Sequence, residues 1–120
     1  MSVGLLISRD LLFTSKVTGT ASELGLTVQT VFDGPSAVAR IAAEKVPAVF
    51  VDLAAPGLDL PGFMAALPAG NPPAVIAFGS HVATAILQAA REAGCADVLP
   101  RSRFSAELPE ILRRYLAAPE

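Results

Sequence analysis

Residues 48–59 read Ala-Val-Phe-Val-Asp-Leu-Ala-Ala-Pro-Gly-Leu-Asp, and this stretch decides the fold. It begins as a short apolar run that ends in a carboxylate, Asp52, and a Pro-Gly loop follows. Such a run between chain breakers is typical of a strand buried on both faces of a parallel sheet. Ligands bind outside the carboxyl ends of such strands, so Asp52 is expected where chemistry is usually done. The alternative is that Asp52 caps a turn or a helix start.

The chain length and the apolar composition favour one domain over residues 1–120, with a single packed core. Its end, after about residue 117, fits a boundary before another domain. A net charge of −2, with no basic cluster longer than Arg113-Arg114, argues against direct nucleic-acid binding. The lone Cys95 excludes an internal disulfide and a cysteine zinc cluster. No stretch approaches a membrane span, and we expect a cytoplasmic protein.

Strand-like and helix-like segments alternate along the chain. Strands are expected at 3–8, 26–31, 48–52, 74–78 and 95–99, and helices at 11–24, 35–46, 61–67 and 82–93, with a last helix ending near 117. Asp10 is expected to cap the first helix and Gly25 to stop it. Pro109 places the regular start of the last helix nearer Leu108. In the fourth helix, Ile86, Leu87 and Ala90 are predicted to face inward.

Five such repeats imply parallel strands joined by right-handed crossovers. The sequence therefore predicts an α/β, flavodoxin-like (βα)5 fold, a doubly wound five-stranded sheet in order 2-1-3-4-5. Its switch point lies between the first and third strands, beside Asp52. The residues that follow the other strands should face or flank this crevice: Ser8, Arg9, Asp10, Ser80, His81 and Arg101.

Three segments together resemble the receiver domain of bacterial response regulators, a CheY-like family. Residues 52–59 look like the family's phospho-acceptor aspartate and its D-L-x-x-P-G-x-D loop. Residues 78–80 resemble the end of the fourth strand, and residues 93–99 resemble the A-G-A-x-D-Y-L run of the fifth. The likeness covers essentially the whole chain. It implies that Asp52 is the acceptor position and that Ser80 contacts the phosphoryl group.

The sequence departs from this family at most chemical positions. The acidic pair that holds Mg²⁺ aligns with Ser8 and Arg9, and Asp10 stands one position too late. A guanidinium at Arg9 would repel Mg²⁺ and is expected to reach Asp52 as its counter-ion. The family's lysine is replaced by Arg101, and the switch aromatic of the fifth strand by Val98. No metal ligands and no cofactor are therefore expected.

These departures favour an atypical receiver, or pseudo-receiver. It would be a protein-interaction module of two-component or phosphorelay signal transduction, not an enzyme, and would work without Mg²⁺-dependent aspartyl phosphorylation. Its partner would be another signalling protein or an output domain. The resemblance also implies a face for homodimers and output contacts, formed by the fourth helix, fifth strand and fifth helix.

Two alternatives stay open. In the first, the protein is a phospho-accepting receiver: Asp52 is the nucleophile, Asp10 or Asp59 helps to hold Mg²⁺, and Ser80 and Arg101 contact the phosphoryl group. In the second, the crevice belongs to a small flavodoxin-like enzyme or ligand-binding domain. No glycine-rich phosphate loop follows the first strand, which weighs against this second alternative.

Two further side chains have a functional and a structural interpretation. His81 would be an in-line base or a phospho-histidine, or simply a loop residue that narrows the entrance. Cys95 would be a reactive thiol or a small buried apolar residue. In both cases the sequence favours the structural interpretation, because no other histidine supports His81 and Cys95 stands at the start of a predicted buried strand.

Overall fold

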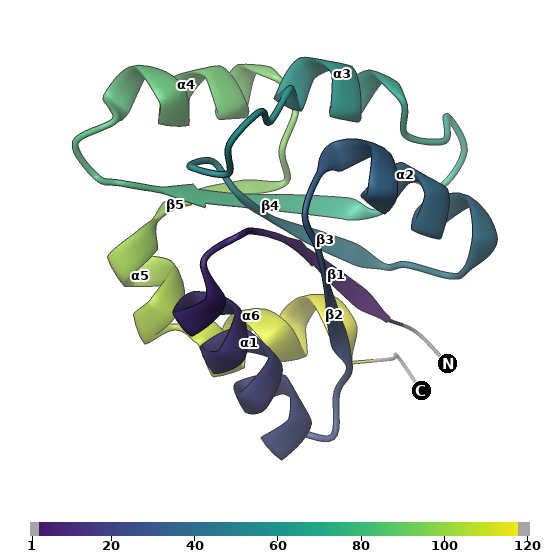
Figure 1. The fold of residues 1–120 in the computed structure, drawn as a ribbon, viewed down its shortest axis with the longest axis vertical. Helices are drawn as coiled ribbons and strands as arrows, with labels where there is room; N and C mark the ends of the chain where they lie inside the picture. Colours follow the sequence, from purple (N-terminus) through teal and green to yellow (C-terminus); the bar gives the residue numbers. More distant parts are fainter. Residues whose placement is uncertain (1–2, 118–120) are drawn as a thin grey trace.

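The structure, a computed structural model, describes residues 3–117. A single sheet of five parallel strands has the predicted order β2-β1-β3-β4-β5 (Figure 1). The strands are β1 (Gly4–Ile7), β2 (Val28–Val31), β3 (Ala48–Asp52), β4 (Ala74–Gly79) and β5 (Asp97–Pro100). The flavodoxin-like prediction is thereby confirmed.

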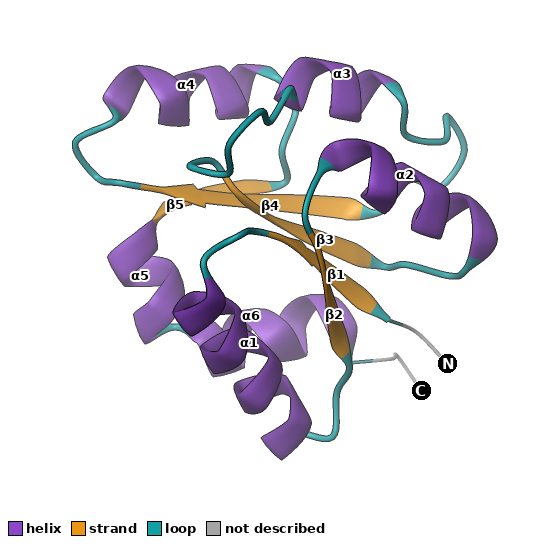
Figure 2. Cartoon of the chain, in the orientation of Figure 1, coloured by secondary structure: helices purple, strands orange, loops and turns teal. Residues whose placement is uncertain are grey.

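Helices cover both faces of this sheet, as Figure 2 shows. One layer holds α2 (Gly34–Ala43), α3 (Leu60–Ala65) and α4 (Thr84–Glu92), and the other holds α1 (Leu11–Glu23), α5 (Arg101–Ala106) and α6 (Leu108–Leu116). Each layer buries its own apolar cluster against the strands. Successive side chains of β3 point alternately into the two clusters. Val49 and Val51 face α2–α4, whereas Phe50 faces α1, α5 and α6.

The first helix begins and ends within one residue of its prediction, whereas the second begins one residue before its predicted start and ends at Ala43, three residues before its predicted end. Asp10 caps α1 by accepting a hydrogen bond of 3.1 Å from the amide of Phe13. Gly25, just beyond α1, has φ of +74°, a conformation that glycine adopts without strain. Asp33 caps α2, and Pro35 lies in its first turn, where no amide donor is needed.

The C-terminal segment differs from the prediction of a single helix. The helix α5 begins directly after β5 at Arg101, and Glu107 separates it from α6. Pro109 lies in the first turn of α6, so the predicted start near Leu108 is confirmed. The sequence did not reveal α5 as a separate helix because no capping side chain marks its start: the preceding residue, Pro100, makes no side-chain cap.

One inward-facing residue of α4 was predicted wrongly. Leu87 and Ala90 are buried, but Ile86 is 52% exposed. Consecutive helical residues stand about 100° apart, so Ile86 and Leu87 cannot both face the centre of a narrow contact. Within residues 3–117, no helix is long and apolar enough to span a bilayer.

Candidate functional site

Asp52 is the last residue of β3 and is 2% exposed. It lies two residues after Phe50, so strand alternation directs it to the side of the sheet covered by α1 and α5. The site is built around this carboxylate by the loop after β1, the loop after β3 and the start of α5. A charge this deeply buried is stable only when it is paired and hydrogen-bonded.

Three donors meet the Asp52 carboxylate. The hydroxyl of Ser8 donates to Oδ2 at 2.8 Å. The backbone amide of Ala54 donates to Oδ1 at 2.9 Å, and Nη2 of Arg101 donates to the same oxygen at 2.9 Å. Both carboxylate oxygens are therefore engaged, and no buried side-chain nitrogen or oxygen in residues 3–117 lacks a partner.

Arg101 is the first residue of α5, and four side chains surround its guanidinium. Besides Asp52, Oδ2 of Asp10 lies 3.6 Å from its Nη1. The guanidinium carbon lies 4.7 Å from the ring centre of Phe13 and 5.3 Å from that of Phe78. These separations are typical of cation–π contacts. The sequence indicated Arg101 as a site residue, but it did not predict the two aromatic contacts.

Ser8 is fully buried, as its place directly after β1 suggests. Its hydroxyl donates to Asp52 and accepts from the amide of Asp10 at 3.2 Å. The serine that aligns with one position of the family's acidic pair thus hydrogen-bonds Asp52 directly.

Arg9 does not contact Asp52, so the prediction that it supplies the counter-ion is wrong. Its side chain is exposed, and its guanidinium lies 5.8 Å from the ring centre of Phe32. The physical reason is alternation: Ser8 points toward Asp52, and the next residue of an extended segment points elsewhere. Arg101, which lies far along the chain, provides the counter-ion instead.

The remaining predicted site residues do not join this group. Ser80 is exposed, and its hydroxyl accepts a hydrogen bond of 3.4 Å from the amide of Val82. His81 is also exposed. Val98 is buried, at 7% exposure, in the core cluster beneath α2–α4.

Asp59 and Cys95 have structural roles in the structure. Asp59 caps α3 by accepting a hydrogen bond of 3.0 Å from the amide of Gly62. Cys95 is half-buried and packs against the core beneath α2–α4. Burial raises the pKa of its thiol, which favours the protonated, unreactive form.

The donor set around Asp52 does not fit the Mg²⁺ ion that the resemblance implies. Mg²⁺ requires several oxygen ligands in octahedral geometry, supplied chiefly by carboxylates and water. Here a guanidinium is bonded to Oδ1 of Asp52 and also faces Asp10. In the described part of the chain, no three acidic, histidine or cysteine side chains gather as metal ligands.

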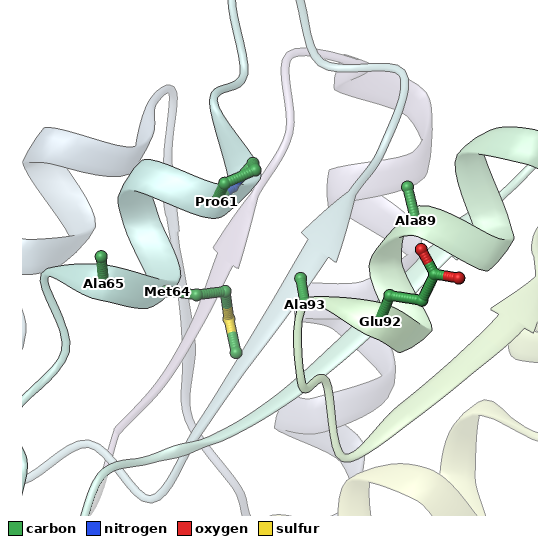
Figure 3. A pocket seen from close by; sticks show the side chains of 6 residues that line it. All are labelled: Pro61, Met64, Ala65, Ala89, Glu92 and Ala93. Atoms are coloured by element: carbon green, nitrogen blue, oxygen red, sulfur yellow. The ribbon is translucent and has the colours of Figure 1, made fainter.

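A concave region lies away from Asp52, between α3 and α4 (Figure 3). This open hollow has a volume of about 510 Å³ and is lined by Pro61, Met64, Ala65, Ala89, Glu92 and Ala93. Glu92 carries its one charge and accepts a hydrogen bond of 3.3 Å from Gln88. The lining includes no pair of groups suited to acid–base or nucleophilic chemistry, so Asp52 remains the candidate site.

Solved structures supply the comparison. The chain aligns over 94% of its length with 96% of a response-regulator receiver domain from Bermanella marisrubri, with 19% identity and a TM-score of 0.80. It aligns over 94% with 95% of the receiver domain of a sensor histidine kinase from Pseudomonas aeruginosa PAO1, with 24% identity and a TM-score of 0.78. That second structure has a magnesium ion coordinated in its active-site cleft.

The receiver domain of NtrX from Brucella abortus gives 21% identity and a TM-score of 0.77, over 97% of this chain and 99% of that one. No protein-family model and no curated protein matches the sequence. The structural likeness extends over nearly the whole of both chains in each comparison. The protein has the fold of the receiver domains of response regulators.

Proposed function

We propose that the protein is an atypical receiver, a pseudo-receiver, that acts as a protein-interaction module in two-component or phosphorelay signal transduction. It does not use Mg²⁺-dependent aspartyl phosphorylation, and it is not an enzyme. One observation carries the proposal: the Arg101 guanidinium donates to Oδ1 of Asp52 at 2.9 Å, within the receiver fold.

The chemistry of phosphoryl transfer supports this proposal. An aspartate nucleophile must present a free carboxylate oxygen to phosphorus, and a cation must neutralise the charge on the transferring group. In this chain Arg101 and Ala54 donate to Oδ1, and Ser8 donates to Oδ2. Attack through Oδ1 would compete with the bonds from Arg101 and Ala54, and attack through Oδ2 with the bond from Ser8. The buried pair therefore favours one persistent state of the site.

The surroundings of Asp52 support the same conclusion. The resemblance assigns the phosphoryl contact to the hydroxyl of Ser80, but this residue is exposed and turned to its own loop. It assigns the moving aromatic of β5 to the position of Val98, whose small side chain is packed in the core. A relay from Asp52 through these two positions lacks its usual parts, and no metal or cofactor is needed for binding alone.

The partner is expected to be a signalling protein or an output domain in the cytoplasm. The candidate surface is the face of α4, β5 and the C-terminal helices α5 and α6, which together take the place of the predicted last helix, and it would also carry a homodimer. Ile86 on α4 is 52% exposed, and Arg91 and Arg103 are exposed on α4 and α5. Exposed apolar and charged side chains together are a common composition for a transient protein interface. Size-exclusion chromatography with light scattering tests for the homodimer.

The deciding experiment is a backbone-amide NMR titration, first with Mg²⁺ and then with beryllium fluoride as an acyl-phosphate mimic. We expect no shifts clustered at Asp52, Ala54, Ser80 and Arg101. Shifts at these amides would contradict the proposal. They would instead support a phospho-accepting receiver in which Asp52 is the acceptor.

A further inference from the structure

The Arg101 guanidinium lies between two carboxylates on one side and two aromatic rings on the other. It donates to Asp52 at 2.9 Å and lies 3.6 Å from Asp10. The rings of Phe13 and Phe78 are 4.7 and 5.3 Å away. The ion pair alone would leave the long arginine side chain several conformations. The aromatic faces restrict that choice.

Phe13 is held in place by the same carboxylate that faces the guanidinium. One oxygen of Asp10, Oδ1, accepts a hydrogen bond from the amide of Phe13 at 3.1 Å. The other oxygen, Oδ2, faces Arg101. The ring of Phe13 also contacts Phe78, with centres 5.0 Å apart and planes at 41°. The first turn of α1 therefore fixes both a charge and a ring beside the guanidinium.

Phe78 supports the arrangement from the sheet. It is fully buried in β4, and its ring stacks on that of Phe104 with centres 4.4 Å apart. Phe104 belongs to α5, three residues after Arg101, so the same helix supplies the guanidinium and its anchor in the core. Phe13 is only half-buried, which makes it the part of this support that can be altered without emptying the core.

We propose that Phe13 is a positioning residue whose ring holds the Arg101 guanidinium on Asp52, so that Arg101 serves as the built-in cation of the site. An external divalent cation is thereby kept away from the oxygens of Asp52, Asp10 and Ser8. This inference rests on the proposed function, because it assumes that the site is permanently paired.

Displacing the guanidinium should allow a divalent metal ion to bind, because the groups that it leaves are oxygen ligands. The carboxylates of Asp52 and Asp10 both face the guanidinium, and carboxylate oxygens are hard ligands, which suit Mg²⁺ or Mn²⁺. Arg101 interacts with both carboxylates of that set. If the guanidinium is displaced in a fraction of the molecules, the two carboxylates are available to a cation in that same fraction. Loss of a cation–π contact corresponds to roughly a two- to thirtyfold change in that equilibrium.

The test uses the whole chain and two NMR measurements, paramagnetic broadening by Mn²⁺ and ¹⁵N relaxation of the Arg101 Nε. The variants are Phe13→Leu, which removes the aromatic face; Phe13→Tyr, which retains it; and Arg101→Gln. We expect Mn²⁺ to broaden the Ala54 amide strongly in Arg101→Gln. In Phe13→Leu the Ala54 amide should broaden at Mn²⁺ concentrations that leave the parent protein unbroadened, and the Nε should become mobile. Phe13→Tyr should behave as the parent protein does.

Phe50→Leu is the structural control, because Phe50 contacts Phe104, with ring centres 5.9 Å apart, but not Arg101. It should lower stability without changing either measurement. A folded Phe13→Leu variant whose Arg101 stays as rigid as in the parent protein would overturn the positioning role. Absence of Mn²⁺ broadening in Arg101→Gln would overturn the exclusion of cations. Broadening at Ala54 in the parent protein would instead contradict the proposed function itself.

Discussion

Nη2 of Arg101 lies 2.9 Å from Oδ1 of Asp52, although 49 positions separate the two residues in the chain. Asp52 ends β3 and Arg101 follows β5, and β4 lies between these two strands. The contact therefore spans β4 at the C-terminal edge of the sheet. The Asp52 side chain is 3% exposed and that of Arg101 is 31% exposed. The pair is therefore much better shielded from water than a surface ion pair.

Arg101→Gln should lower the free energy of unfolding by roughly 2–4 kcal/mol, because it leaves a buried carboxylate without its charge partner. Urea denaturation checks this prediction through a lower midpoint with an unchanged m-value. The matched control is Arg103→Gln, on the same helix. Arg103 forms an exposed pair with Glu107 at 2.9 Å, and its loss should leave the midpoint unchanged. Equal losses in both variants would show that Asp52 does not depend on Arg101.

Ser8→Ala should cost about 1.5–3 kcal/mol, because the hydroxyl donates to a buried charged oxygen and has no replacement there. Thr14→Val provides the comparison. Thr14 is also a buried hydroxyl residue, but its Oγ1 donates at 3.0 Å to the neutral carbonyl of Leu11. We expect the smaller loss at Thr14 by the same denaturation measurement. A Ser8→Ala loss no larger than that of Thr14→Val would argue against a buried charge at Asp52.

The fold could be predicted almost completely from local patterns. The apolar run of residues 48–52 and four similar runs predicted the strands, and the alternation with helices required the parallel order. Caps at Asp10 and the glycine at Gly25 marked the ends of α1. These features succeed because each depends on neighbours within a few residues. The start of α5 could not be predicted in this way, because no capping side chain marks it.

The sequence predicted the position of the site but only part of its membership. Strand ends brought Ser8, Asp52 and Arg101 to one edge, as the topology requires. Which arginine reaches the aspartate depended on side-chain direction across long chain separations, which the sequence does not contain. The sequence therefore favoured Arg9 over Arg101. The contact between Phe13 and Arg101 could not be predicted either, because an apolar residue in the first turn of a helix is ordinarily interpreted as a core residue.

Ile86 and Leu87 provide a direct test of how α4 lies on the sheet. Leu87 is 5% exposed and Ile86 is 52% exposed. Leu87→Ala should cost about 2–5 kcal/mol through lost burial and the remaining cavity. Ile86→Ala should change stability by no more than about 0.5 kcal/mol. Thermal denaturation of both variants decides the matter, and a larger loss at Ile86 would mean that α4 is rotated from its position here.

Two glycines of the α1 region should respond to alanine in opposite directions. Gly19 lies within α1, and an added Cβ would meet nothing within 4 Å. Gly19→Ala should therefore stabilise the protein by about 0.5–1 kcal/mol through helix propensity. Gly25 has equally open surroundings but a φ of +74°. Gly25→Ala should destabilise the protein by about 1–2 kcal/mol. Urea midpoints that move in the same direction would refute the assigned end of α1.

Asp33 should make the stability of α2 depend on pH. Hydrogen bonds from Ser36, whose amide donates at 2.8 Å, lower the pKa of Asp33, and the nearby charge of Arg9 lowers this pKa further. Because the native carboxyl has the lower pKa, the unfolded chain binds more protons in this range. The stabilising contribution is thus complete above the unfolded pKa of about 3.9 and is lost as the pH falls through the native value.

Asp33→Asn isolates this contribution, since asparagine caps a helix about as well but does not titrate. We expect the parent protein to gain stability over Asp33→Asn as the pH rises from about 3 to about 6, where the carboxylate forms. Urea denaturation of both proteins across that interval measures the difference. Parallel stability curves would show that the charge of Asp33 adds nothing to its role as a cap. A difference that shrank with rising pH would mean that Asp33 is repelled by its surroundings, and that the Ser36 amide does not stabilise its ionised form.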